Sequence, residues 1–197
     1  YDPHEPYAPP EPFASRYPRT PYDGEVAYVD ATLGRVLDAL DKTGRLERTL
    51  VVVTSDHGEG LGDHGERTHG LFAYQSTLHV PLIVWCRDRI RPATEATPIG
   101  LADVAPIVGD LVGVPIAPGA GNPGRGIYFE ALNANLTRNW APLTGMIVGN
   151  LKLIDLPEPE LYDLAGDPTE TMNIYARRTE DAPRIESRLD DITARAV

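Results

Sequence analysis

Apolar side chains recur at helical spacing in three parts of the chain. The longest run lies near the N-terminus, where Asp23 is a suitable N-cap and Gly44 is placed to end the helix. Its apolar stripe consists of Val26, Val29, Leu33, Val36, Leu37 and Leu40. The same spacing predicts a helix over residues 101–115 and a terminal helix over residues 182–197. The terminal helix would carry Ile185, Leu189 and Ile192 on one face.

Short runs of β-branched and apolar residues lie between these helices. Residues 49–55 (TLVVVTS) are apolar on both faces, which is typical of a strand buried in a parallel sheet. Residues 80–86 (VPLIVWC) predict a second buried strand. Three shorter strands are expected further along, at residues 126–132, 144–150 and 151–156, before a turn-rich segment at 160–173.

This order of elements predicts an α/β protein in two parts. Residues 1–115 alternate helix and strand and would form an α/β layer. Residues 116–197 would form a small α+β subdomain, an antiparallel sheet followed by a C-terminal helix. The Gly- and Pro-rich residues 116–126 would connect the two parts.

Composition narrows the range of partners. The 197 residues include 29 acidic and 18 basic side chains, a formal net charge of −11. This excess of negative charge argues against nucleic acid as the main partner, although a local basic pocket for a small anion is compatible with it. No apolar run is long enough to span a bilayer and no targeting segment is evident, so membrane anchoring and compartment stay open.

Candidate chemistry is concentrated directly after the first predicted strand. Residues 51–70 (VVVTSDHGEGLGDHGERTHG) hold three of the five histidines, and Asp56 and His57 stand where the strand ends. Ligands of open α/β sheets bind beyond the carboxyl ends of the strands, and Asp oxygen with His nitrogen can hold a divalent cation. The glycines of the loop would let the backbone turn sharply and approach a ligand. Two ligands alone do not define a site, and the alternative is a polar loop at a strand end.

Four ordered segments make the chain resemble a known family. They are TSDHGEGLGDHG with THG and VPLIV after it, DPHEPY at residues 2–7, YDGEVAYVDATLGRVLDAL at 22–40, and LKLIDLPEPELYDLAGDPTETMN at 151–173. Together they resemble the sulfatase branch of the alkaline phosphatase superfamily. The resemblance implies that the α/β layer is part of an α/β/α sandwich of the alkaline-phosphatase type. It also implies hydrolysis of a small-molecule sulfate ester, or of a phosphate ester, with a divalent metal.

The resemblance also implies roles for individual residues. Asp56 and His57 would be two of the metal ligands, with Ca²⁺ the expected metal and Mn²⁺ or Zn²⁺ also compatible with an Asp-His pair. His69 and His4 would be catalytic and would contact the substrate anion. Arg67 would bind the anion as a forked donor, or lie on the surface.

The nucleophile of the family is absent from these residues. Sulfatases use a formylglycine made from Cys or Ser in a Cys/Ser-x-Pro-x-Arg motif, and no such motif occurs here. The chain is therefore expected to be the C-terminal half of a sulfatase-like enzyme, inactive alone, with formylglycine in the other half. Two alternatives stay open: a phosphoethanolamine or phosphoglycerol transferase or phosphodiesterase of the same superfamily, and a non-catalytic binding domain.

Several other polar and aromatic residues are predicted to be structural. Tyr22, Asp23, Glu25 and Asp30 should cap the first helix or lie on its solvated face. Asp63 and His64 should be solvated loop residues, although an orienting role behind a ligand is the alternative. Trp140 should pack under the small sheet instead of lining a substrate pocket.

Overall fold

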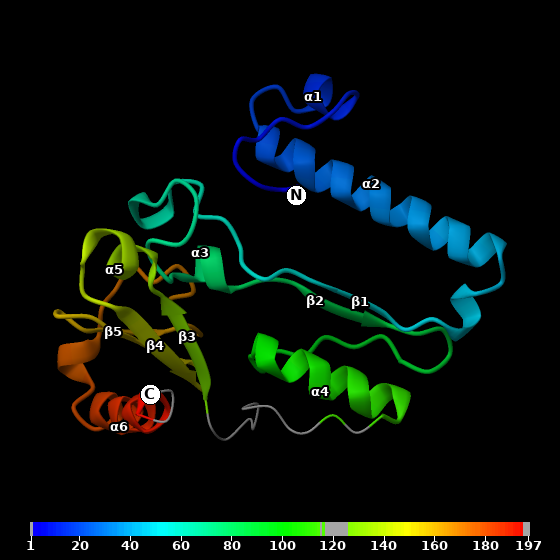
Figure 1. Ribbon diagram of the computed structural model, residues 1–197. Helices are drawn as coiled ribbons and strands as arrows, with labels where there is room; N and C mark the ends of the chain where they lie inside the picture. The colour runs from blue at the N-terminus through cyan, green and yellow to red at the C-terminus, as the bar shows by residue number, and fades with distance from the viewer. Residues whose placement is uncertain (1, 115, 117–125, 195–197) are drawn as a thin grey trace. The chain divides into compact units, whose positions relative to one another are not determined.

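The computed structural model describes residues 2–114, 116 and 126–194 and shows helices with antiparallel strands (Figure 1). The chain divides into two compact units. One consists of Tyr1–Thr54 with Leu82–Ala93, and the other of Ser55–Pro81 with Thr94–Val197. The predicted connection at 116–126 lies mostly outside the described residues, so the predicted boundary after residue 115 stays a prediction.

The first unit is dominated by one long helix. It contains α1 (Phe13–Arg16), α2 (Pro21–Lys42), a 3₁₀ turn η1 (Leu46–Arg48), β1 (Val51–Thr54) and β2 (Leu82–Trp85). Helix α2 begins at Pro21, because proline suits the first helical position, so Asp23 lies in the first turn and the predicted N-cap is wrong. Gly44 follows the C-terminus with φ +66°, as expected of the residue that ends a helix.

The pairing of β1 differs from the prediction. β1 pairs antiparallel with β2, with Val51 opposite Trp85 and Thr54 opposite Leu82, in a sheet of two strands. The three valines of β1 are half-buried instead of fully buried. An apolar strand is compatible with either direction of its neighbour, so the predicted parallel sheet was not determined by the residues themselves.

The second unit contains the loop with the three histidines and a four-stranded sheet. Its elements are η2 (Asp63–Gly65), α3 (Gln75–Leu78), α4 (Leu101–Val112), β3 (Ile127–Ala131), α5 (Asn133–Arg138), β4 (Leu143–Val148), β5 (Leu151–Asp155), β6 (Glu160–Asp163), η3 (Tyr175–Arg177) and α6 (Asp181–Thr193). The sheet is an antiparallel meander in the order β3-β4-β5-β6. The small antiparallel sheet and the C-terminal helix are therefore confirmed (Figure 1).

Each face of this sheet buries a separate apolar cluster. On one face, Ile185 and Leu189 of α6 pack against Met146, Leu153 and Leu161. The other face presents Phe129, Leu143 and Ile154, against which Ala73 and the neighbouring Phe72 and Tyr74 pack. The segment that follows the histidine loop is thus anchored on the sheet by apolar burial.

Candidate functional site

The loop after β1 is held by backbone hydrogen bonds that only glycine permits. Gly58 N donates to Thr77 O at 2.8 Å, and Gly60 N donates to Thr68 O at 2.7 Å. A Cβ on Gly58 would lie 2.3 Å from Ser76 O, and one on Gly60 would lie 2.5 Å from Glu66 O. Both glycines are therefore required by close contacts with backbone atoms of the loop and of α3, while the predicted approach to a ligand stays a prediction.

The side chains of Asp56 and His57 lie close to each other just after β1. His57 Nδ1 lies 2.9 Å from Gly58 O, and since a carbonyl only accepts, Nδ1 carries the hydrogen. The other ring nitrogen, Nε2, is 3.9 Å from Asp56 Oδ2. Desolvation is the largest single influence on the pKa of Asp56 and raises it, but the electrostatic effect of His57 and the hydrogen bonds that the carboxylate accepts together outweigh it and hold that pKa below its usual value.

These two donors fit part of a metal site. Bonds from O or N to a divalent cation are about 2.0–2.4 Å long, so donors 3.9 Å apart can share one ion. A backbone carbonyl on the second nitrogen, as His57 has, is the usual outer partner of a metal-bound imidazole. Within the described parts of the chain, no group of three His, Cys, Asp or Glu residues could hold a metal, so Asp56 and His57 form at most part of a ligand set.

The structure brings His69 against His57. Their rings stack with centroids 4.0 Å apart and an interplanar angle of 29°. His69 Nδ1 lies 3.2 Å from Glu59 Oε1, and the Glu59 side chain is 5% exposed. Glu59 was missed by the sequence analysis, because an acidic residue in a polar loop gives no signal until the loop folds back on itself. It orients His69 as Gly58 O orients His57.

His4 lies in the first unit, in the loop before α1. Its backbone N donates to Glu25 Oε2 at 2.9 Å, and Ala8 N donates to Glu25 Oε1 at 2.6 Å. Glu25 is 1% exposed, so the prediction that it lies on a solvated helix face is wrong. Its carboxylate accepts hydrogen bonds from two backbone N–H groups of the loop that do not take part in a helix or strand. The His4 loop is therefore fixed by Glu25 as well as by its prolines.

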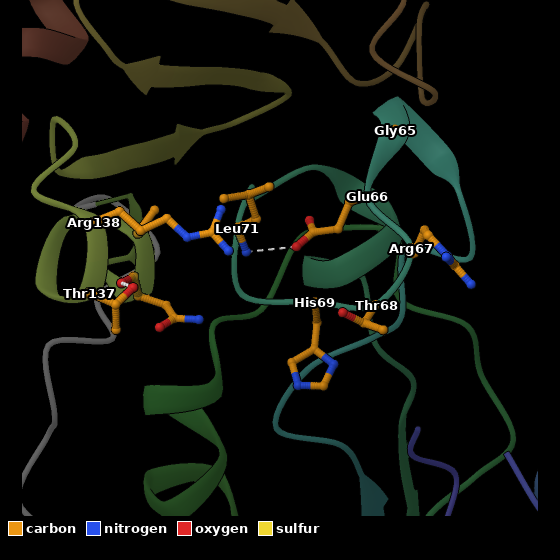
Figure 2. A pocket seen from close by; sticks show the side chains of 10 residues that line it. Gly65, Glu66, Arg67, Thr68, His69, Leu71, Thr137 and Arg138 are labelled. Atoms are coloured by element: carbon orange, nitrogen blue, oxygen red, sulfur yellow. Dashed lines mark hydrogen bonds between the residues drawn. The ribbon is translucent and has the colours of Figure 1, made fainter. Parts of the chain in front are cut away.

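Arg67 and His69 lie at a pocket of about 240 Å³, together with residues of α5 (Figure 2). Arg67 is exposed, and in Figure 2 its side chain extends to the side away from α5. Arg138 reaches from α5 toward the loop, and its guanidinium carbon lies 5.6 Å from the centroid of the Trp140 ring. Trp140 is 51% exposed, so its predicted packing under the sheet is wrong.

His64 is not a solvated loop residue, contrary to the prediction. Its ring stacks on Tyr74 with centroids 3.6 Å apart and an interplanar angle of 10°. Its Nε2 lies 3.0 Å from Thr169 O, which only accepts, so His64 donates to the turn after β6. Its side chain is 20% exposed. His64 thus joins the histidine loop to the C-terminal turn within the second unit.

Replacing His64 by alanine is expected to lower the free energy of unfolding by about 1–2 kcal/mol, because one ring stack and one hydrogen bond are lost. Urea unfolding of the variant would measure this change. The matched control is His79→Ala, since His79 is exposed, and its effect should stay within about 0.5 kcal/mol. Equal midpoints for the two variants would show that His64 stabilises nothing.

Comparisons with known proteins identify the family of the chain. The model of the Sulfatase family, a branch of the alkaline phosphatase superfamily, matches residues 1–114. The chain therefore belongs to the sulfatase family. Its fold is the α/β fold of that family with a small antiparallel sheet and a C-terminal helix.

Curated relatives are similar to the chain over most of its length. Arylsulfatase K of Xenopus laevis is 29% identical over 88% of this chain and 37% of its own. N-acetylglucosamine-6-O-sulfatase of Bacteroides thetaiotaomicron is 29% identical over 79% of this chain and 32% of its own. Choline-sulfatase of Rhizobium meliloti is 29% identical over 81% of this chain and 33% of its own. The chain spans about a third of the length of these relatives.

Solved structures share the fold. A protein in complex with its substrate, D-glucosamine-2-N,6-O-disulfate, superposes with a TM-score of 0.70 at 25% identity, over 92% of this chain and 42% of that one. A 2-O GAG sulfatase superposes with a TM-score of 0.75 at 22% identity, over 89% of this chain and 42% of that one. The second likeness supports the fold alone. No helix in the described residues is both long and apolar enough to cross a membrane.

Proposed function

We propose that the protein to which this chain belongs is a metal-dependent sulfuric ester hydrolase, and that this chain supplies part of its metal and anion site. The observation that carries the proposal is the contact between the Asp56-His57 pair and the His69 ring. It puts two candidate cation ligands beside a candidate proton donor, as the hydrolysis of an anionic ester requires. The names of the curated relatives support sulfate as the transferred group.

We assign each residue a role in this proposal. Asp56 and His57 Nε2 would hold the divalent cation, Ca²⁺ in our proposal, which would neutralise charge on the sulfate oxygens. With Nδ1 of His69 held by the Glu59 carboxylate, Nε2 is the nitrogen from which His69 would give a proton to the departing alcohol. The Glu59 carboxylate would stabilise the charged imidazole before that transfer. His4 and Arg67 are proposed to contact the anion, and the attacking formylglycine to come from outside residues 1–197.

The full-length protein should hydrolyse 4-nitrophenyl sulfate and lose that activity when a chelator removes the metal. Readdition of Ca²⁺, Mn²⁺ or Zn²⁺ in separate assays would identify the metal that restores turnover. Bis(4-nitrophenyl) phosphate serves as the competing substrate. Faster turnover of the phosphate diester would favour a phosphodiesterase or transferase instead, and no turnover of either ester at any metal would favour a non-catalytic domain.

A further inference from the structure

The pocket beside His69 is more basic than the chain around it. The whole sequence has 29 acidic and 18 basic side chains, yet the pocket is lined by Arg67 and Arg138 and by a single carboxylate, Glu66. Glu66 is 5% exposed, and its two oxygens accept hydrogen bonds from Leu71 N at 2.7 Å and Phe72 N at 3.1 Å. Both Glu66 oxygens are therefore occupied by backbone donors, and Arg138 provides a positive charge on the α5 side of the pocket.

Arg138 is held in place without a carboxylate partner. Among the described residues no acidic side chain forms an ion pair with it, and its guanidinium lies over the Trp140 ring at 5.6 Å. Ring stacking restrains a long side chain and leaves its forked N–H donors available to a ligand. Figure 2 shows Arg138 extending from α5 toward the loop that carries Leu71, next to Thr137 of the same helix. Asn133, one turn earlier, adds an amide to this lining.

We propose that this pocket receives the leaving group of the substrate and that Arg138 recognises a second anionic group on it, a sulfate or a carboxylate. This inference rests on the proposed function, because the reacting ester would lie at His69 and the rest of the substrate between the loop and α5. The pocket volume of about 240 Å³ is smaller than that of pockets for drug-sized ligands, which is roughly 300–1,000 Å³. The pocket therefore suits one sugar ring with its substituents. Arg138 is then a specificity-determining residue for a sugar ester that carries two negative groups.

The test compares two sugars that differ only in the second anion. Wild-type full-length protein and Arg138→Gln are assayed with glucosamine 6-sulfate whose amine is either acetylated or sulfated. The quantity compared is kcat/KM for the doubly charged sugar divided by kcat/KM for the singly charged sugar. Loss of one charge-assisted contact in Arg138→Gln should lower this ratio by about 10- to 100-fold. Arg138→Lys keeps the charge but not the fork and should lie between the two. A uronic acid ester in a parallel series would show whether carboxylate is preferred over sulfate.

The matched control is Arg184→Gln, which removes one exposed arginine from α6. Its kcat/KM ratio should equal that of wild type, and an equal ratio for Arg138→Gln would overturn the inference. Calorimetric titration with the doubly sulfated sugar gives a readout that does not depend on turnover. Binding that weakens in Arg138→Gln, in a protein that hydrolyses neither these sugars nor 4-nitrophenyl sulfate, would support the pocket and refute the sulfatase activity. Hydrolysis of the sugars, together with unchanged binding in Arg138→Gln, would support the sulfatase activity and refute the role of Arg138 in the pocket.

Discussion

The replacement His57→Ala is expected to lower kcat/KM of the full-length protein for 4-nitrophenyl sulfate by more than about 100-fold, the upper range for loss of an outer partner of a metal ligand. The reason is that His57 Nε2 lies 3.9 Å from Asp56 Oδ2, a spacing that allows both to hold one cation. The variant should also contain less divalent metal per chain, as measured by plasma mass spectrometry. Unchanged metal content and turnover would show that His57 is not a ligand.

Alanine at position 57 also removes the ring that stacks on His69, so a second variant is needed to separate the two effects. Asp56→Asn provides this separation, because the Asp56 side chain is 89% exposed and takes no part in the stack. It should lose metal and turnover while the midpoint of urea unfolding, measured on metal-free protein, stays close to that of wild type. His79→Ala is the matched histidine control and should keep both properties. A drop in activity for His57→Ala alone would point to support of His69 instead of metal binding.

Periodicity predicted the helices α2, α4 and α6 and most strands, whereas α1, α3 and α5 are too short to show a repeating pattern and were missed. Leu189 and Ile185 of α6 pack on the small sheet, as their spacing in the sequence indicates. The strand β6 was missed, because its four residues precede a segment rich in turn formers and only Leu161 and Tyr162 are buried. The partner of β1 was also beyond the sequence, since an apolar strand does not encode the direction of its neighbour.

The candidate site shows the same division between local and long-range information. Asp56 and His57 are adjacent in sequence, so their side chains lie close together without any long-range contact. Glu59 with His69 and His64 with Thr169 are separated by 10 and 105 positions, and no local pattern links them. Glu25 illustrates the reverse error, because helical spacing assigned it to a solvated face while the N-terminal loop covers it.

A buried ion pair is expected to have the second large effect, on the free energy of unfolding. Lys152 Nζ lies 2.5 Å from Glu170 Oε1, and the two side chains are 0% and 1% exposed. Burial lowers the pKa of Lys152, and the Glu170 carboxylate opposes this shift by favouring the charged amine. The rings of Phe129 and Tyr74 face the ammonium at 5.3 and 5.7 Å. The Lys152 ammonium is therefore stabilised by the Glu170 carboxylate and by two aromatic rings, in an otherwise apolar layer.

The other carboxylate oxygen of Glu170 fixes the segment after the histidine loop. Glu170 Oε2 accepts a hydrogen bond from Gln75 N, the first residue of α3, at 2.5 Å. Lys152 thus stabilises, through Glu170, the point at which the chain leaves the loop and enters α3. Separating the electrostatic part of this interaction from the hydrogen bond requires a glutamine at 170, which keeps an acceptor for Gln75 N but carries no charge.

Lys152→Met is expected to lower the free energy of unfolding by about 3–5 kcal/mol, because it leaves Glu170 as an uncompensated buried charge. The double variant Lys152→Met/Glu170→Gln should regain most of that loss, since an uncharged pair of similar volume costs little to bury. Urea unfolding of the two single variants and the double variant forms a complete cycle. Arg184→Met, which breaks an exposed ion pair with Asp181, should change the free energy by less than about 1 kcal/mol. A double variant no more stable than Lys152→Met would mean that packing around Lys152, and not the buried charge of Glu170, accounts for the loss.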